Sequence, residues 1–198
     1  MNLLPIAVEE MGFAVPENNV LEFIGKVAGE CYMSDMTTDK CINRALNVIK
    51  RGHHSPWEHY HVTLRCTVDR GVSHALVRHR HCAFQQSSTI YHKYSNIVLT
   101  DMSSGSEDFY RACEIEYNRL IAEGKEPSEA RDVLPNALAT NLIITTNIRQ
   151  WMYMIHRRTG YGDSKKMHLW AKTTREWFEK QYPRITLAFD TWYDKHPL

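Results

Sequence analysis

Apolar and polar residues alternate along the chain with two different periods. Over residues 59–69 every second residue is apolar, starting with Tyr60 and Val62, which predicts a half-buried strand. Over residues 37–52 apolar residues recur at spacings of three and four, which predicts a helix that Gly52 ends. The apolar positions of this helix are Cys41, Ile42, Ala45, Leu46 and Ile49.

The rest of the chain predicts further helices and a second strand. Asp69 has the chemistry of an N-cap for a short helix that runs toward Arg78. Residues 139–158 begin with β-branched residues and become helical, and residues 163–183 predict a final long helix that stops at Pro183. Residues 106–124 predict another amphipathic helix, which ends at Gly124. One side of that helix is formed by Phe109, Cys113, Tyr117, Leu120 and Ile121.

Strands and helices are interspersed without a clean βαβ period, so we expect an α+β fold. The length of 198 residues suits one domain over residues 1–198. A net charge of +1 gives no field that would attract polyanions, so we expect no nucleic-acid partner and only local basic sites.

Composition also bears on the compartment. No apolar run approaches the roughly 18 residues that a membrane span needs, and the first residues lack the basic start of a signal peptide. The 5 cysteines form no Cys-x-x-Cys pair, which argues against a disulfide framework and a zinc ribbon. We therefore expect a reducing cytoplasm and no membrane partner.

The stretch from Arg78 to Thr89, RHRHCAFQQSST, concentrates positive charge beside amides and hydroxyls. Guanidinium groups bind phosphate or carboxylate through two hydrogen bonds, so Arg78 and Arg80 together suit a dianion. Because residues i and i+2 do not share a helix face, one or both arginines should lie where a helix ends. Spacing alone favours a solvated helix end over a ligand site.

A second cluster, GHHSPWEHYH, contains His53, His54, His59 and His61. Its spacing matches no familiar zinc motif, and Pro56 prevents a regular helix through it, so we expect no metal. The alternative is a loop that presents His53 and Ser55 to a ligand.

A third group consists of Arg131, Arg149 and Arg158. Arg149 stands among Trp151, Met152 and Met154, where we expect a partly buried guanidinium that needs an anionic or carbonyl partner. Structural ion pairing can explain each arginine singly. Together with Arg78 and Arg80, they favour a phosphate-rich ligand.

Cys82 lies beside the basic cluster, which can lower the pKa of a thiol. No partner base is visible in the sequence, so we do not expect a nucleophile. Phosphate-binding glycine motifs are also absent.

Residues 78–90 fit the pattern Arg-His-Arg-x-x-Ser-x-Asn-Glu-x-Ser-x-Arg, in which Gln is an accepted variant of Glu. The fit is at Arg78, His79, Arg80, Gln86 and Ser88. The segments GHHSPWEH and ARDVLP, and Asn147 with Arg149 and Arg158, extend the similarity over residues 52–158. In this order the segments resemble the flavin-dependent thymidylate synthases; beyond Arg158 the resemblance fades.

The resemblance implies a mixed, mainly antiparallel sheet flanked by helices, and a homotetramer with active sites between subunits. It implies that FAD is reduced by NADPH and that 5,10-methylenetetrahydrofolate donates a carbon to C5 of dUMP, giving dTMP. No enzyme cysteine attacks the pyrimidine in that family.

The resemblance also implies roles by position. The FAD ligands would be His53, Ser55, Arg78, His79, Arg80, Gln86, Asn147 and Arg149. The nucleotide ligands would be Gln86, Ser87, Ser88, Arg131 and Arg158. Arg158 would be the catalytic residue, facing the pyrimidine and stabilising negative charge on its N3/O4 side.

This sequence departs from the family at several positions. Ile90 stands where an arginine helps to hold the dUMP phosphate, and losing such a contact costs about 1.5–3 kcal/mol. Lys93 is a candidate substitute for that charge. The other departures are Ala75 for Gln, Ala83 for Ser, Gln85 for Asn and Tyr153 for Asn.

These departures keep alternatives open. One is a flavin enzyme that methylates or hydroxymethylates C5 of another pyrimidine nucleotide, and another is a non-catalytic flavin- or nucleotide-binding module. A metal-binding protein built on His53, His59, His79 and Cys82 is the remaining alternative. The sequence fixes neither the nucleotide nor the reductant.

Overall fold

This computed structural model describes residues 2–12, 15–31, 33, 37–91, 93–94, 98–100, 104–160 and 162–197. Its strands are β1 (Asn2–Leu4), β2 (Ala7–Glu10), β3 (His61–Asp69), β4 (Ala83–Gln86), β5 (Val98–Thr100) and β6 (Ala139–Asn147). Its longer helices are α1 (Glu17–Glu30), α2 (Thr38–Lys50), α4 (Glu107–Ala122), α6 (Ile148–Arg158), α7 (Lys165–Gln181) and α8 (Pro183–Lys195). The short helices are α3 (Arg70–Leu76), α5 (Pro127–Ala130) and the 3-10 turns η1 (Ser55–Glu58) and η2 (Arg131–Val133).

The main sheet has the order β2-β3-β6-β4, and all its pairings are antiparallel. β1 and β5 form a separate parallel pair. The α+β class and the mainly antiparallel pairing are therefore confirmed, with the parallel pairing confined to the separate pair of β1 and β5. The central pair β3 and β6 is in register from His61 opposite Asn147 to Asp69 opposite Ala139.

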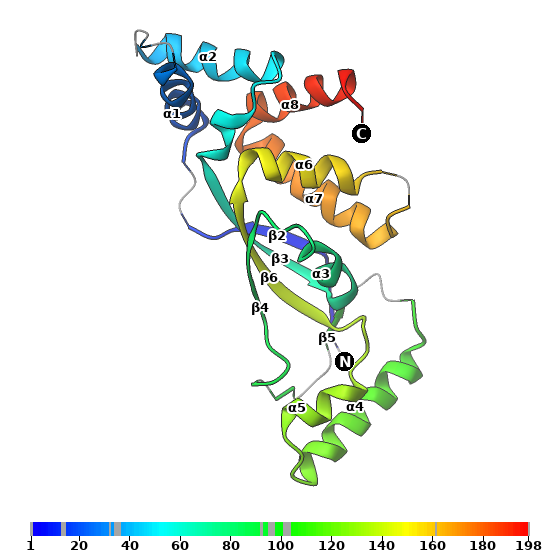
Figure 1. The fold of residues 1–198 in the computed structure, drawn as a ribbon. Coiled ribbons are helices and arrows are strands. Elements are labelled where there is room, and N and C mark those ends of the chain that lie inside the picture. The colour runs from blue at the N-terminus through cyan, green and yellow to red at the C-terminus, as the bar shows by residue number, and fades with distance from the viewer. Residues whose placement is uncertain are drawn as a thin grey trace.

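The alternation along β3 explains which face of the sheet is covered. Val62, Leu64, Cys66 and Val68 are buried, while the residues between them are partly exposed. They belong to one core with aromatic residues of α6, α7 and α8, which lie beside the sheet (Figure 1). α1 and α2 lie at one end of the molecule, and α4 and α5 lie at the other (Figure 1).

Predicted element ends are confirmed at two capping residues. The carboxylate of Asp69 accepts a hydrogen bond from the backbone N–H of Val72 at 2.8 Å, as an N-cap does. Gly52 has a φ of +76°, and the N–H of His53 donates to the carbonyl of Val48 at 2.8 Å. This left-handed turn ends α2 and points the chain toward η1.

Two expectations need correction, and one strand was missed. The helix expected over residues 163–183 does end before Pro183, as α7, but it is not the last helix, since Pro183 begins α8, and proline is well tolerated at a first helical position. In α4, Phe109 is 56% exposed and Tyr110 is buried in its place. The strand β4 was not predicted, since its only large apolar residue is Phe84.

None of the helices in the described part of the chain combines the length and the apolar character needed to cross a membrane.

Candidate functional site

Several of the residues predicted to bind cofactor or nucleotide lie in three places. His53 and Ser55 line a large cavity next to α2. His79 and Arg158 meet between α3 and α6. Ser87 and Ser88 line a smaller cavity beside β4.

The large cavity has a volume of about 920 Å³ and lies between α1, α2 and η1. His53 and Ser55 are both exposed on it. The turn at Gly52 sets the place of His53, because its backbone N–H closes the end of α2. A cavity of this size suits a cofactor-sized ligand.

One face of α2 also lines this cavity, and its residues were not among the predicted ligands. It carries Lys40, Arg44, Asn47 and Arg51, whose spacings of four, three and four place them on one side of a helix. The guanidinium of Arg44 donates to the carbonyl of Gly25 on α1 at 3.1 Å. In the sequence, these residues are the polar positions that lie opposite the apolar stripe of the helix. Three of them are cationic, so this wall of the cavity is basic.

Asn147 and Arg149 lie at the start of α6, next to η1. The Asn147 side chain accepts a hydrogen bond from the N–H of Gln150 at 2.8 Å and so caps the helix. Arg149 forms an ion pair with Glu58 of η1, and its side chain is 49% exposed. The expectation of a partly buried guanidinium at Arg149 is therefore wrong, since Trp151 and Met152 face the core from other sides of the helix.

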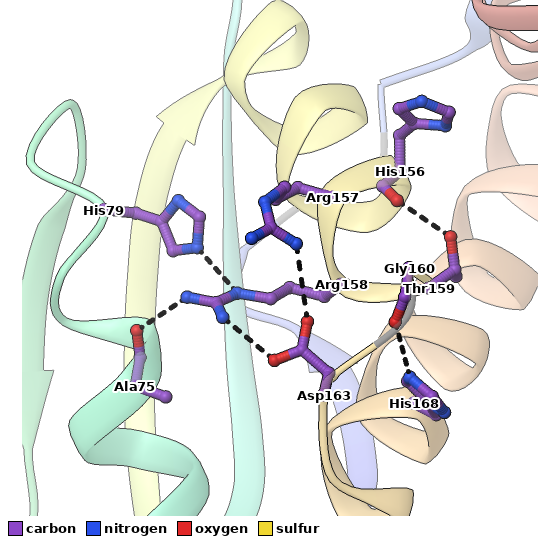
Figure 2. Close-up of polar contacts among 9 residues, drawn as sticks. All are labelled: Ala75, His79, His156, Arg157, Arg158, Thr159, Gly160, Asp163 and His168. Atoms are coloured by element: carbon purple, nitrogen blue, oxygen red, sulfur yellow. Dashed lines mark hydrogen bonds and ion pairs between the residues drawn. The ribbon is translucent and has the colours of Figure 1, made fainter. Parts of the chain in front are cut away.

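Arg158, at the end of α6, is the partly buried arginine, with a side chain 17% exposed (Figure 2). Its Nε donates to Nε2 of His79 at 3.0 Å, and its Nη2 donates to the carbonyl of Ala75 at 3.1 Å. Its Nη1 donates to Oδ1 of Asp163 at 3.1 Å. Three of the five N–H groups of a guanidinium thus have acceptors among the described residues.

His79 must be neutral in this arrangement. Its Nε2 accepts a hydrogen bond from Arg158, so the ring proton belongs on Nδ1. Burial, followed by the charges of Arg158 and Arg157, lowers the pKa of His79 from 6.5 to about 4. The ring therefore offers a neutral N–H donor at neutral pH.

Arg78 and Arg80 follow the end of α3, as their spacing predicted, and both side chains are exposed. Neither they nor His79 belong to the described residues that line the large cavity. Along α6, Arg158 is nine residues beyond Arg149, which is about 14 Å of helix. One chain therefore presents its predicted cofactor ligands as two separate groups.

Gln86 connects β4 to α3. Its Nε2 donates to Oγ of Ser73 at 3.0 Å and to Oγ1 of Thr140 at 3.3 Å. The Ser73 hydroxyl donates its own proton to the carbonyl of Arg70 at 3.0 Å, so it must accept from Gln86. This directs the Gln86 amide nitrogen into the protein and leaves its carbonyl oxygen for another partner.

The smaller cavity has a volume of about 420 Å³ and a partly polar wall. Ser87 and Ser88 line it together with Thr67, Thr140 and Asn141. The Ser88 hydroxyl accepts a hydrogen bond from the N–H of Ile90 at 3.0 Å, which bends the chain after β4. The cavity thus joins hydroxyl and amide groups that suit a sugar or phosphate.

Arg131 lies apart from these places. It begins η2, its side chain is exposed, and it is not among the described residues lining either cavity. Ile90 and Lys93 are also exposed.

Cys82 does not have an activated thiol. Burial raises its pKa, and its Sγ lies 3.6 Å from the sulfur of Met154. Within the described ranges no group of three or more His, Cys, Asp or Glu residues is placed to hold a metal ion.

Taken together, the geometry combines cations, a neutral imidazole and fixed hydroxyl and amide groups. Cations bind phosphate, and a guanidinium fixed in place can stabilise negative charge that develops on a carbonyl-containing ring. No described group has the form of an activated nucleophile. The arrangement suits a nucleotide and a phosphorylated cofactor.

Curated relatives carry a consistent description. A flavin-dependent thymidylate synthase of Geobacter sulfurreducens is 31% identical over 123 residues, which cover 56% of this chain and 53% of that protein. One from Mycobacterium sp. is 30% identical over 70% of this chain and 66% of its own length. A probable flavin-dependent thymidylate synthase of Paramecium bursaria Chlorella virus 1 is 26% identical over 72% of this chain and 77% of its own length. The chain thus spans only about half of the Geobacter protein.

Solved structures show the same fold. The UMP/dUMP methylase PolB from Streptomyces cacaoi, bound with 5-Br dUMP, has a TM-score of 0.77 at 21% identity, covering 96% of this chain and 97% of that one. Its structure with 5-Br UMP gives a TM-score of 0.75, also at 21% identity and with 97% of each chain covered. The family model for the thymidylate synthase complementing protein matches residues 17–184. The chain therefore belongs to the thymidylate synthase complementing protein family.

Proposed function

We propose that this protein is a flavin-dependent thymidylate synthase. It would transfer the one-carbon unit of 5,10-methylenetetrahydrofolate to C5 of dUMP and complete the methyl group with a hydride, giving dTMP. The observation that carries the proposal is the fixed guanidinium of Arg158, held at 3.0–3.1 Å by His79, Asp163 and Ala75. Family membership supports the reaction class.

The residues present fit FAD. The large cavity has a cofactor-sized volume of about 920 Å³ and a basic wall that matches a pyrophosphate. His53, Ser55 and Arg149 would hold one part of the cofactor at this cavity. Arg78, His79 and Arg80 would hold another part, with the Nδ1–H of His79 as a neutral donor to a carbonyl or ring nitrogen.

Bound FAD, reduced by NADPH, would supply the hydride. The chain's own contribution is to bind and polarise the pyrimidine. Arg158 would donate the N–H groups that have no acceptor among the described residues to the N3/O4 side of the ring, which stabilises negative charge there and makes C5 more nucleophilic. Gln86, Ser87, Ser88 and Arg131 would hold the sugar and phosphate, and C5 would lose its proton to solvent or a bound base.

No covalent attack by the protein is part of this proposal. Burial raises the pKa of the Cys82 thiol, so it would be protonated at neutral pH. Activation of the pyrimidine would rest on electrostatics alone.

We also propose that the active site is completed by a second copy of the chain, within a homotetramer. Its support is the separation between the cavity lined by His53 and the pair His79–Arg158 at the far end of α6. A cofactor that contacts both groups is more easily held between two copies than along one.

The free thiols of all five cysteines support a reducing, cytoplasmic location.

A second candidate is a flavin enzyme that methylates another pyrimidine nucleotide. Two observations favour it. The side chain at position 75, next to the backbone carbonyl that Arg158 meets, is only a methyl group, and Ile90 brings no charge beside Ser88. The neighbour PolB is described as acting on both UMP and dUMP.

The test is NADPH oxidation by FAD-loaded protein with dUMP, UMP, dCMP and CMP added in turn. Samples that respond are given methylenetetrahydrofolate, and their products are weighed by mass spectrometry. A dUMP response with the gain of one methyl group supports thymidylate synthesis, and preference for another nucleotide supports the second candidate. Flavin binding with no turnover of any nucleotide would leave the non-catalytic binding module.

A further inference from the structure

Asp163 lies opposite Arg158 in the loop between α6 and α7, outside every segment that resembles the family pattern (Figure 2). The two side chains are equally buried, 17% exposed for Arg158 and 16% for Asp163. Arg157 approaches the second carboxylate oxygen at 3.9 Å but is itself 49% exposed. Asp163 is thus the acidic partner of the partly buried guanidinium.

The loop that carries Asp163 is fixed at both sides. His168 of α7 forms a hydrogen bond with the carbonyl of Gly160 at 3.0 Å. The hydroxyl of Ser164 caps α7 by accepting from the N–H of Met167 at 3.2 Å. Gly162 has a φ of +96°, a conformation that favours glycine. These contacts hold the backbone on both sides of Asp163, and the contact with Arg158 holds its carboxylate.

The three acceptors around Arg158 come from three segments. His79 belongs to the loop after α3, Ala75 to α3 itself, and Asp163 to the loop before α7. Of these acceptors only Asp163 carries a charge. A carboxylate makes the strongest of these hydrogen bonds, so it should fix the rotation of the guanidinium and thereby the direction of Nε toward His79.

We propose that Asp163 is a positioning residue that locks Arg158 and, through it, holds His79 in the tautomer with its proton on Nδ1. If the carboxylate is removed, the guanidinium gains alternative orientations, and His79 loses the donor that occupies its Nε2. The imidazole can then carry its proton on either nitrogen. Both the nucleotide-facing and the cofactor-facing groups would lose their alignment together.

The kinetic part of this inference rests on the proposed function, but the structural part does not. The first measurement is therefore the His79 tautomer, read from the imidazole nitrogen shifts of histidine-labelled protein without cofactor. The His79 signal is assigned by its loss in His79→Gln. We expect a single Nδ1–H form in the native protein and a mixture of tautomers in Asp163→Asn, which keeps the shape and removes the charge.

The second measurement is the steady-state kinetics of the FAD-loaded protein. Asp163→Asn should lower kcat by roughly tenfold to a hundredfold, the effect of misplaced catalytic groups, while the Kd for FAD rises by a smaller factor, because most of the proposed FAD ligands contact neither Arg158 nor Asp163. Asp163→Glu should recover part of the loss and part of the tautomer purity, since it restores the charge. Asp194→Asn, an exposed aspartate on α8, is the matched control and should change neither readout.

The outcomes separate the two proposals. If the native protein turns over no pyrimidine nucleotide, the proposed function is wrong. The tautomer measurement still tests the role of Asp163 in that case. An unchanged tautomer in Asp163→Asn overturns the inference. The inference is also overturned if both variants lose the same melting temperature and Asp163→Glu recovers neither kcat nor the single tautomer. Asp163 would then serve only the fold of the loop.

Discussion

Arg158 donates through Nε to Nε2 of His79 at 3.0 Å, a hydrogen bond that only a neutral imidazole can accept. A protonated imidazole would place N–H against N–H and a positive charge against a guanidinium. Burial, followed by the nearby charges of Arg158 and Arg157, lowers the pKa of His79 to about 4 and so favours the same neutral form. Asp163 opposes these effects only weakly.

This relationship predicts a loss of stability in weak acid. The unfolded chain protonates His79 near pH 6.5 and the folded chain only near pH 4, so the unfolded state binds more protons between these values. Stability is therefore fully present above pH 6.5 and falls as the pH drops toward 4, by about 1 kcal/mol between pH 7 and pH 5, because solvent screens part of the effect at a half-buried ring. Urea denaturation at both pH values measures it.

The control is His79→Gln, whose amide oxygen can still accept from Arg158 but does not titrate. His54 also has a pKa lowered by burial and contributes with the same sign, but it is present in both proteins. The difference in slope between native protein and His79→Gln therefore isolates His79. Equal slopes would show that His79 is protonated normally in the folded protein.

Replacements of Arg158 and of Arg78 should separate nucleotide turnover from FAD binding. Arg158→Ala should lower nucleotide turnover by about a hundredfold or more, because a fixed donor to developing charge is lost, and it should leave FAD bound. Arg158→Lys keeps a charge beside Asp163, yet it should also be slow because it lacks the planar fork. Turnover and FAD fluorescence titration measure the two effects.

Arg78→Ala should instead weaken FAD binding, since its exposed guanidinium is proposed to meet the cofactor. Arg111→Ala is the control, because Arg111 is exposed on α4 and pairs with Glu107 of the same helix at 2.7 Å. Native FAD affinity in Arg78→Ala would mean that Arg78 is ordinary surface charge.

Arg149 should matter for the cofactor and not for the fold. Its ion pair with Glu58 is about half exposed on both sides, 49% and 46%, and such pairs contribute at most about 1 kcal/mol. Arg149→Ala should therefore barely change the melting temperature but reduce FAD affinity at the large cavity. Arg65→Ala removes a similarly exposed pair with Glu9 on the sheet and should change neither. A large drop in melting temperature would assign Arg149 a structural role.

The contrast between Arg149 and Arg158 shows where a sequence pattern fails. Trp151 and Met152 are near Arg149 in sequence, but on a helix they face other sides, so apolar neighbours did not imply a buried guanidinium. Arg158 is buried by segments far away in sequence, α3 and the loop with Asp163. That partner has no signal in the sequence other than its place between Gly162 and the N-cap Ser164.

The fold was more accessible than the site. The strands β3 and β6 are each half-buried, so their alternation shows in the sequence, and Asp69 and Gly52 mark their neighbouring helices by local chemistry. β4 is defined by pairing with β6, from Ala83 opposite Thr145 onward, and that pairing is a tertiary contact. The basic face of α2 has no distinguishing sequence pattern, because charged residues opposite the apolar stripe are also typical of a solvated helix face.

Ile90→Arg should strengthen nucleotide binding. Ile90 is 40% exposed, and its backbone N–H donates to the Ser88 hydroxyl, so a longer cationic side chain has room beside the proposed phosphate site. A charge-assisted phosphate contact is worth about 1.5–3 kcal/mol, or about one to two decades in Kd. Calorimetric titration with dUMP and with deoxyuridine measures it, because only the phosphate should gain.

Ile115→Arg is the matched control, since Ile115 is 63% exposed on α4. A gain of equal size for deoxyuridine, or in the control, would show that position 90 does not face the phosphate.

Gly25→Ala should open the contact between α1 and α2. A Cβ at this position would lie 1.9 Å from the backbone carbonyl oxygen of Cys41, and backbone cannot rotate away as a side chain can. Overpacking ordinarily costs about 1–3 kcal/mol, and we expect this substitution to reach or exceed the upper value in urea denaturation. The control is Gly71→Ala, where the nearest atom is the Asn136 side-chain amide at 3.1 Å, which can move.

The same substitution should affect the cofactor. Because Arg44 donates to the Gly25 carbonyl at 3.1 Å, a displaced α1 should also disturb the basic wall of the large cavity and weaken FAD binding. A stable Gly25→Ala protein with native FAD affinity would show that the two helices separate without cost and that their close approach does not shape the cavity.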